Sequence, residues 1–351
     1  PRAVPLAIFL SIASITALSV FAIESNARER EQARLRAAAQ SIATALERRS
    51  QDFSSYLRAG AALFSTTQNV ELEAFSQFVS ELRLDLEYRG SEGLGWVTVI
   101  QGADAAGFLA QQRVEQAEFP DIRPSLAQDG RILAPVTYFR PDTARNRSAL
   151  GFDMYSDPVR SDAMGEALRT VQPTASARIS LAQEGEGETP GCVMFMPVFR
   201  QIVGGSAVDR ALAGFVYSPF NAERFLDAAV KDTDASSFGV LLYDGASPSD
   251  RVLVSHALSG GKGPTIRQPL VIANRNLTLV LEAPNRGTLD PLSMISLVFG
   301  LTLASLLMLL ARLLTQQAFE DQSRLTFFEE QHSIRNSLTR ELNHRVKNTL
   351  A

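Results

Sequence analysis

The chain has 351 residues, of which 45% are hydrophobic, so it can form one large or two ordinary domains besides membrane segments. Its 34 basic and 38 acidic residues give a net charge of -4, which does not suggest a nucleic-acid binder. The single cysteine, Cys192, excludes an intrachain disulfide and a metal site built from several cysteines, and we expect it to be buried. The sequence opens with Pro1 and closes at Ala351 within a helical pattern, so we expect a fragment of a longer protein.

Two stretches are long and apolar enough to cross a membrane. Residues 4–23 (VPLAIFLSIASITALSVFAI) carry no charge, and their length as a helix matches a hydrocarbon core of about 30 Å. A cleavable signal peptide is the alternative, but the apolar run is longer than usual and no small-residue cleavage site follows it. Residues 291–314 begin with an uncharged run that ends at Arg312, which is longer than the run of a typical buried core helix. The sequence therefore predicts two transmembrane helices.

Two spans place both chain ends on one side of the membrane and residues 24–290 on the other. The basic residues do not fix the orientation, because Arg2 and Arg312 are matched by Arg28 and Arg30. The orientation must come from chemistry near the C-terminus.

Residues 24–64 predict a long stalk helix. Its apolar or small positions step by three and four residues, as in a heptad pattern: Leu35, Ala39, Ile42, Leu46, Phe53, Tyr56, Gly60 and Leu63. We expect this stripe to pair with a second copy of the chain. The alternative is a single helix that packs on its own domain.

Residues 65–288 predict a mixed α/β domain with antiparallel sheets. Short β-rich runs occur at 93–100, 131–139, 191–199, 211–217, 238–244 and 277–283. Helical periods fit Ala103–Gln116, Pro158–Val171 and Pro219–Ala229, with Asp157 as the N-cap of the second. The Gly- and Glu-rich residues 184–188 predict a loop, since the sequence contains no glycine-rich nucleotide motif, and no metal site is predicted.

This segment resembles the CHASE family of extracellular sensor domains, known from plant cytokinin receptors and many bacterial kinases. The resemblance rests on APVTYF at 134–139, ALGFDM at 149–154, the helix with Arg160, and VMFMPVF at 193–199. It implies a stalk helix followed by tandem PAS-like sheets, the membrane-distal one of which holds a small ligand.

The same resemblance places a ligand-binding aspartate at Asp153. The alternative is that Asp153 caps backbone N–H groups before the helix at Pro158. The receptors have a pocket-facing hydroxyl where this sequence has Phe195, so cytokinin is not the expected ligand. An apolar pocket would be lined by Tyr138, Phe152, Met194, Phe195 and Met196, although such residues in strands are more often ordinary core.

Residues 315–351 predict a long helix that continues out of the membrane and pairs with a second copy. Apolar residues recur at near-helical spacing: Leu325, Phe328, Ile334, Leu338, Leu342, Val346 and Leu350. His344 lies two residues from both Leu342 and Val346, so on a helix it points away from this stripe. An exposed imidazole is a good phosphoryl acceptor.

The segment RELNHRVKNTLA, residues 340–351, resembles the phosphoacceptor box of HWE-type two-component histidine kinases. The resemblance implies phosphorylation of His344, with Glu341 as an orienting or basic residue and with Arg345, Lys347 and Asn348 supporting the transfer. It also implies ATP and Mg²⁺ as cofactors of the full-length kinase, a homodimer, and an aspartate on a response regulator as the next acceptor. Since ATP is cytoplasmic, residues 24–290 are expected outside a bacterial inner membrane, with both ends inside. Without an ATP-binding domain the fragment alone is not expected to be active.

Two other functions remain open. A non-kinase receptor or adhesin would use the outer domain only for binding and would carry no phosphate on His344. A hydrolase is disfavoured, because His256 is the only histidine of the outer segment and no G-x-S-x-G or H-E-x-x-H motif accompanies it.

Overall fold

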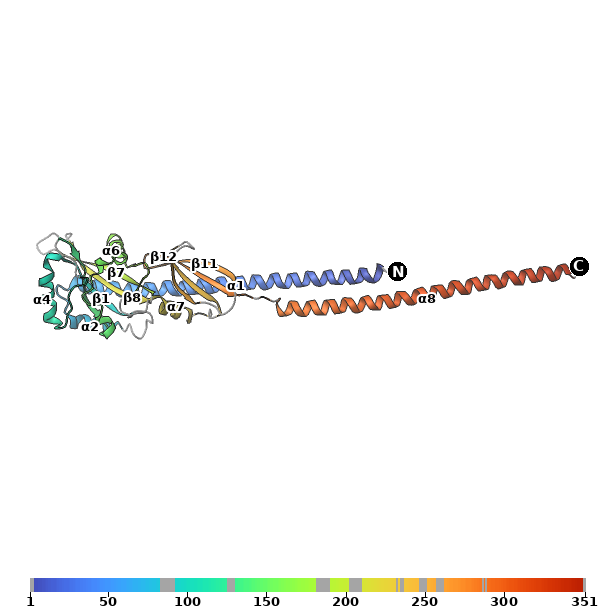
Figure 1. Ribbon diagram of the computed structural model, residues 1–351, viewed down its shortest axis with the longest axis horizontal. Coiled ribbons are helices and arrows are strands. Elements are labelled where there is room, and N and C mark those ends of the chain that lie inside the picture. The colour runs from blue at the N-terminus through green and yellow to red at the C-terminus, as the bar shows by residue number, and fades with distance from the viewer. Residues whose placement is uncertain are drawn as a thin grey trace. The chain divides into compact units, whose positions relative to one another are not determined.

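The computed structural model (Figure 1) describes residues 3–82, 92–124, 130–180, 190–201, 210–231, 233, 237–245, 251–256, 262–285, 287 and 289–349. Side chains beyond residue 340 are not described. The loop predicted at 184–188 lies outside the described residues. The chain divides into two compact units, one made of residues 1–31 and 286–351 and the other of residues 32–285.

The first unit is formed by the start of helix α1 (Ala3–Thr66) and by helix α8 (Pro291–Thr349). Both helices contain segments that are long and apolar enough to cross a membrane, and few side chains in these segments are buried. Within this unit a Cβ atom at Gly300 would lie 2.2 Å from Thr16 Oγ1, so the two helices pack closely at a residue without a side chain. The backbone N–H of Asp290 donates to Glu24 Oε1 at 2.8 Å, and this hydrogen bond lowers the pKa of Glu24.

The larger sheet of the second unit has six strands among the described residues. They are β1 (Leu94–Thr98), β4 (Val136–Arg140), β5 (Thr174–Ala175), β6 (Ile179–Ser180), β7 (Pro190–Gln201) and β8 (Arg210–Asn221). The order is β4-β1-β8-β7-β5, with β6 also paired to β7, and every pairing is antiparallel. A small ladder joins β2 (Ile100–Gln101) to β3 (Ile132–Leu133).

The smaller sheet has the order β10-β9-β12-β11. Its strands are β9 (Gly239–Asp244), β10 (Arg251–His256), β11 (Lys262–Ile272) and β12 (Arg275–Pro284). In both sheets the last strand in the chain pairs with the first, and the second strand lies at the edge beside the first. The two sheets therefore have the same arrangement of first, second and last strands, and they differ by the extra strands of the larger sheet.

The two sheets meet through a tight turn. Ala273 and Asn274 connect β11 to β12 with positive φ angles of 43° and 61°, a conformation typical of two-residue hairpins. The carbonyl of Ala273 accepts a hydrogen bond from Ala175 N at the edge of the larger sheet, at 2.8 Å. Arg275 forms an ion pair with Asp244, whose other oxygen accepts from Arg178 N at 3.2 Å. These bonds tie the sheets into one unit.

The stripe on the stalk is buried within its own domain. One hydrophobic cluster contains α1 residues, including Leu35, Ile42 and Phe53, together with residues of both sheets, and Figure 1 shows α1 running along the sheets. A Cβ atom at Gly60 would lie 3.0 Å from Val216, which brings α1 directly onto β8. The expectation that this stripe pairs with a second copy is therefore wrong, because the chain's own sheets cover it.

Helices complete the unit at its ends and faces. They are α2 (Leu72–Glu81), η1 (Gly102–Asp104), α4 (Ala105–Glu115), α5 (Ala144–Arg147), η2 (Met154–Ser156), α6 (Pro158–Thr170) and α7 (Ala222–Lys231). The helices predicted at 103–116 and 158–171 are found within a residue or two of their limits. The third begins at Ala222 and not at Pro219, because Pro219 is still paired with Val193 between β8 and β7.

Candidate ligand-binding site

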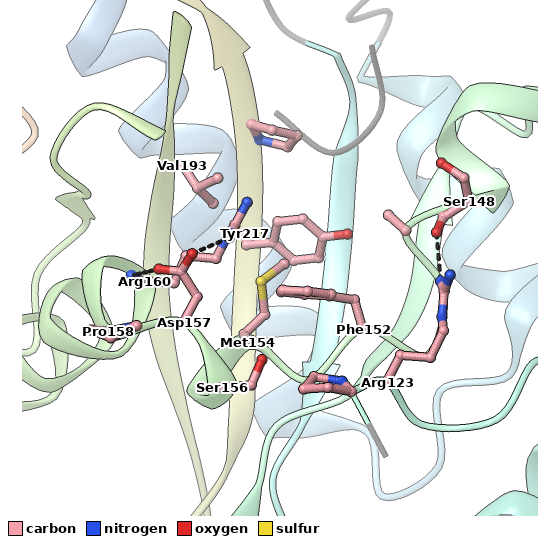
Figure 2. Close-up of a pocket in the computed structure, with 13 residues that line it drawn as sticks. Arg123, Ser148, Phe152, Met154, Ser156, Asp157, Pro158, Arg160, Val193 and Tyr217 are labelled. Atoms are coloured by element: carbon pink, nitrogen blue, oxygen red, sulfur yellow. Dashed lines mark hydrogen bonds and ion pairs between the residues drawn. The ribbon is translucent and has the colours of Figure 1, made fainter. Parts of the chain in front are cut away.

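A cavity of about 590 Å³ lies on the face of the larger sheet opposite α1. Figure 2 shows side chains from the start of α6, from β7 and β8 and from the segment before α6 around it. Its lining residues are Arg123, Pro124, Ser148, Ala149, Phe152, Met154, Ser156, Asp157, Pro158, Arg160, Val193, Tyr217 and Pro219. The volume lies within the range of small-molecule sites.

The start of α6 supplies one wall. Asp157 has extended backbone angles and accepts a hydrogen bond from Arg160 N at 3.0 Å, while Pro158 occupies the first helical position. The other oxygen of Asp157 accepts from Arg160 Nη1 at 2.7 Å. One carboxylate thus caps the helix and also fixes the guanidinium beside the cavity.

Arg160 is a largely buried cation, since its side chain is 8% exposed. Its guanidinium carbon lies 5.0 Å from the centre of the Phe152 ring, within the range of a cation–π contact. Burial lowers the pKa of Arg160, and the neighbouring carboxylate of Asp157 acts in the opposite direction. Arg160 therefore joins a polar wall to an aromatic one.

Tyr217 on β8 belongs to the floor of the cavity. It is 1% exposed, and its hydroxyl has no hydrogen-bond partner among the described residues. Burial raises the pKa of this hydroxyl, which the positive charge of Arg160 opposes. A buried hydroxyl without a partner has a free-energy cost, so it indicates a site at which a water or ligand could complete the bonding.

Arg123 lies on the side of the cavity opposite α6 (Figure 2). Its Nη2 donates to the carbonyl oxygens of Ser148 at 2.7 Å and Leu150 at 3.0 Å. No carboxylate pairs with it in the part of the chain that the structure describes. The guanidinium is therefore positioned by neutral carbonyl groups, and no described carboxylate balances its charge.

Of the residues predicted to bind a ligand, Phe152 lines this cavity and Asp153 does not. Asp153 is 4% exposed, and its Oδ1 accepts from the backbone N–H groups of Ala134 at 2.8 Å and Tyr155 at 3.1 Å. This arrangement is the capping role that the sequence left as the alternative.

The other predicted pocket residues lie on both faces of the larger sheet. Tyr138, Met194 and Met196 face the cluster that includes α1, and Tyr138 donates to Glu115 Oε2 at 2.8 Å. Phe195 is on the opposite face but is fully buried below the cavity, against Phe215 and Tyr217. None of these four belongs to the lining of the cavity described here.

The C-terminal residues are placed by their backbone alone. Helix α8 continues to Thr349 and therefore includes His344. The side chains of Glu341, His344, Arg345, Lys347 and Asn348 lie outside the described residues.

Sequence reasoning did not assign Arg123, Ser148 and Tyr217 to a site. Tyr217 lies in a β-rich run, and its position in the strand pattern is the one expected of any core aromatic residue. The pair Asp157 and Arg160, three residues apart at a helix start, carries the one local signal for a charged wall, but the sequence does not show which sheet face it meets.

Comparison with known proteins gives the family. The sequence pattern of the CHASE domain matches residues 68–254, which is more than half of the chain. No curated protein matches the sequence.

Two solved structures show distant similarity to this chain. An extracellular ligand binding receptor from Desulfohalobium retbaense DSM5692 aligns with 14% identity and a TM-score of 0.45, over 71% of this chain and 40% of that one. The ligand-binding domain of the Pseudomonas aeruginosa PAO1 amino acid chemoreceptor PctC, in complex with GABA, aligns with 12% identity and a TM-score of 0.30, over 67% and 94%. The chain thus spans less than half the length of the first of these proteins.

The family match covers the segment whose motifs resemble CHASE domains, including the cavity and the larger sheet. The chain therefore belongs to the CHASE domain family and carries an extracellular sensor domain.

Proposed function

We propose that this chain is the sensor portion of a two-component histidine kinase, in which a small ligand outside the membrane controls phosphorylation of His344. The CHASE family supports the sensing half of this proposal. The signalling half is supported by helix α8, which runs without interruption from the second apolar segment to Thr349. This helix includes residues 340–349 of the RELNHRVKNTLA segment.

The phosphoacceptor chemistry assigns roles to residues near His344. An imidazole nitrogen would attack the γ-phosphoryl group of ATP, ADP would leave, and Glu341 would hold the ring or its proton. Arg345, Lys347 and Asn348 would stabilise the charge of the transferred group. ATP and Mg²⁺ would bind to a part of the protein outside this chain, and an aspartate on a response regulator would receive the phosphate.

This chemistry also sets the proposed topology. Because ATP is cytoplasmic, the two ends of the chain would lie inside a bacterial inner membrane and residues 24–290 outside. The two apolar helices supply the required spans. The shared strand arrangement of the two sheets supports the interpretation of the outer domain as tandem PAS-like sheets.

Signalling would take place in a homodimer. Several large apolar side chains of α8 after the membrane segment are more than half exposed in a single chain: Phe319, Leu325, Phe328, Ile334 and Leu338. Pairing with a second α8 would cover them. A ligand that binds two arrangements of the dimer with affinities differing by a few kcal/mol would shift the position of His344 relative to the kinase domain.

The test is a phosphotransfer assay with labelled ATP on the full-length protein in membranes. We expect an acid-labile label that is lost in His344→Gln. The matched control is His332→Gln, which removes an exposed histidine of the same helix and should keep the label. A label that persists in His344→Gln would contradict the proposal.

The alternative is a receptor or adhesin that uses its outer domain only for binding. It predicts a folded, ligand-binding protein that carries no phosphate on His344 when the full-length chain is supplied with ATP. The same assay separates the two functions.

A further inference from the structure

The charges around the cavity do not cancel. Its lining includes two cations, Arg123 and Arg160, and one anion, Asp157. Because Asp157 is hydrogen-bonded to Arg160, their charges compensate within the α6 wall. The remaining charge of the lining is the positive charge of Arg123.

Arg123 also has hydrogen-bond donors that no described residue uses. Both of its bonds to described residues start from Nη2, at the carbonyls of Ser148 and Leu150. Its Nε and Nη1 donate to no described residue. These bonds hold the guanidinium in place while leaving the donors that an anionic oxygen would accept from.

Apart from Ser148 and Ser156, the rest of the lining is largely apolar. Phe152, Met154 and the ring of Tyr217 lie between the two arginines (Figure 2), and Val193 also belongs to the lining. Arg160 and Phe152 are in cation–π contact, so this part of the wall is already ordered. A ligand with an apolar body would cover these side chains and exclude water from the charged end.

We propose that the cavity binds a small monoanion with a compact apolar body, most simply a monocarboxylate, whose oxygens accept hydrogen bonds from Arg123. The apolar body lies against Phe152 and the ring of Tyr217. A second negative charge is disfavoured because Arg123 is the one cation of the described lining whose charge is not balanced by Asp157. The inference rests on the proposed sensing role of the outer domain, and it is independent of phosphorylation at His344.

Binding is tested on the full chain in lipid nanodiscs by calorimetry and by thermal unfolding. The probes are phenylacetate and its uncharged counterpart phenylacetamide, with benzylphosphonate as a probe of higher charge. We expect phenylacetate to bind and to raise the unfolding temperature, with the amide at least about 10-fold weaker because it lacks the charge-assisted hydrogen bond. No binding of phenylacetate up to about 10 mM, where fragment-sized ligands are detected, would overturn the proposal. Equal binding of acid and amide, or tighter binding of the phosphonate, would also overturn it.

Variants of Arg123 test the contact itself. Arg123→Gln should weaken phenylacetate binding by about 10-fold or more, and Arg123→Lys should restore part of the loss because the charge is kept. The matched control is Arg267→Gln, an exposed arginine of the smaller sheet, which should leave the affinity unchanged. The unfolding temperature without probe shows that each variant is folded. If folded Arg123→Gln binds as the unmodified protein does, the assignment of the anion to Arg123 is wrong.

The two proposals fail in different assays. If phenylacetate binds but His344 carries no acid-labile phosphate, the kinase proposal is contradicted and the anion-site proposal is kept. If His344 is phosphorylated but phenylacetate does not bind, the anion-site proposal is contradicted and the kinase proposal is kept.

Discussion

Gly95 lies directly opposite Tyr217 in the antiparallel pair of β1 and β8, and a Cβ atom at Gly95 would come within 2.1 Å of the Tyr217 ring. The missing side chain on one strand is therefore the space in which the aromatic ring on the next strand lies. The Tyr217 ring can form the floor of the cavity only because Gly95 on the neighbouring strand has no side chain.

We expect Gly95→Ala to displace the Tyr217 ring and to lower the free energy of unfolding by about 1–3 kcal/mol, the usual range for overpacking a core. Equilibrium denaturation of the full chain measures the loss. The control is Gly165→Ala in α6, where a Cβ atom would meet nothing within 4 Å, so this change should stabilise the protein by about 0.5–1 kcal/mol. Equal stability of the two variants would contradict the packing described here.

Asp153 should matter mainly for stability. Asp153→Ala leaves the backbone N–H groups of Ala134 and Tyr155 without their acceptor. We expect a loss of about 1–3 kcal/mol in the free energy of unfolding, as for other buried donors without a partner. Asp142→Ala, which removes a half-exposed carboxylate, should change stability by less than about 0.5 kcal/mol. A stable Asp153→Ala protein that no longer binds ligand would instead favour the direct role implied by the cytokinin receptors.

The Asp157–Arg160 pair should contribute more than an ordinary surface ion pair. Asp157→Ala removes a helix cap and leaves Arg160, with its 8% exposed side chain, without its carboxylate. The expected loss is roughly 1–3 kcal/mol. On the same helix Glu166→Ala breaks a pair with Arg169, whose side chain is 72% exposed, and should cost no more than about 0.5 kcal/mol. Similar losses at the two sites would show that burial of Arg160 has no energetic effect.

Cys192 should be unreactive in the folded protein. It is fully buried, and burial raises the pKa of its thiol to about 12, so almost no thiolate forms at pH 8. Iodoacetamide at pH 8 should therefore modify Cys192 only after denaturant is added, whereas a Ser55→Cys variant, exposed on α1, should react at once. The unfolded thiol ionises near its ordinary pKa, so the contribution of Cys192 to stability is present below about pH 9 and decreases as pH rises toward 12. Rapid modification of the native protein would contradict its burial.

The fold class and several elements could be predicted from the sequence because their signals are local. Asp157 and Pro158 mark the start of α6 by capping chemistry that needs no distant partner. The strands β10 and β11 were not predicted. Pro264 and Pro269 interrupt the β11 run and weaken a strand pattern that pairing with β12 nevertheless completes.

The site was harder to predict because alternation along a strand shows that a residue is buried but not what lies above it. Met194 and Val193 are neighbours on β7, yet Met194 faces the cluster with α1 and Val193 faces the cavity. The sequence pattern treats both as core. The stalk stripe shows the same limit, because a heptad pattern indicates an apolar partner without specifying whether it is a second helix or a sheet of the same chain.

The burial of the stalk has a consequence for where this sensor can be cut. The family match covers residues 68–254, but α1 residues such as Leu46 and Leu57, and β12 residues such as Leu279, are fully buried in the core that the matched segment shares. A protein trimmed to the matched residues would expose the apolar surface that these side chains cover and would be prone to aggregate. The smallest soluble sensor should therefore begin near Gln32 and end near Asn285, which are the limits of the compact unit.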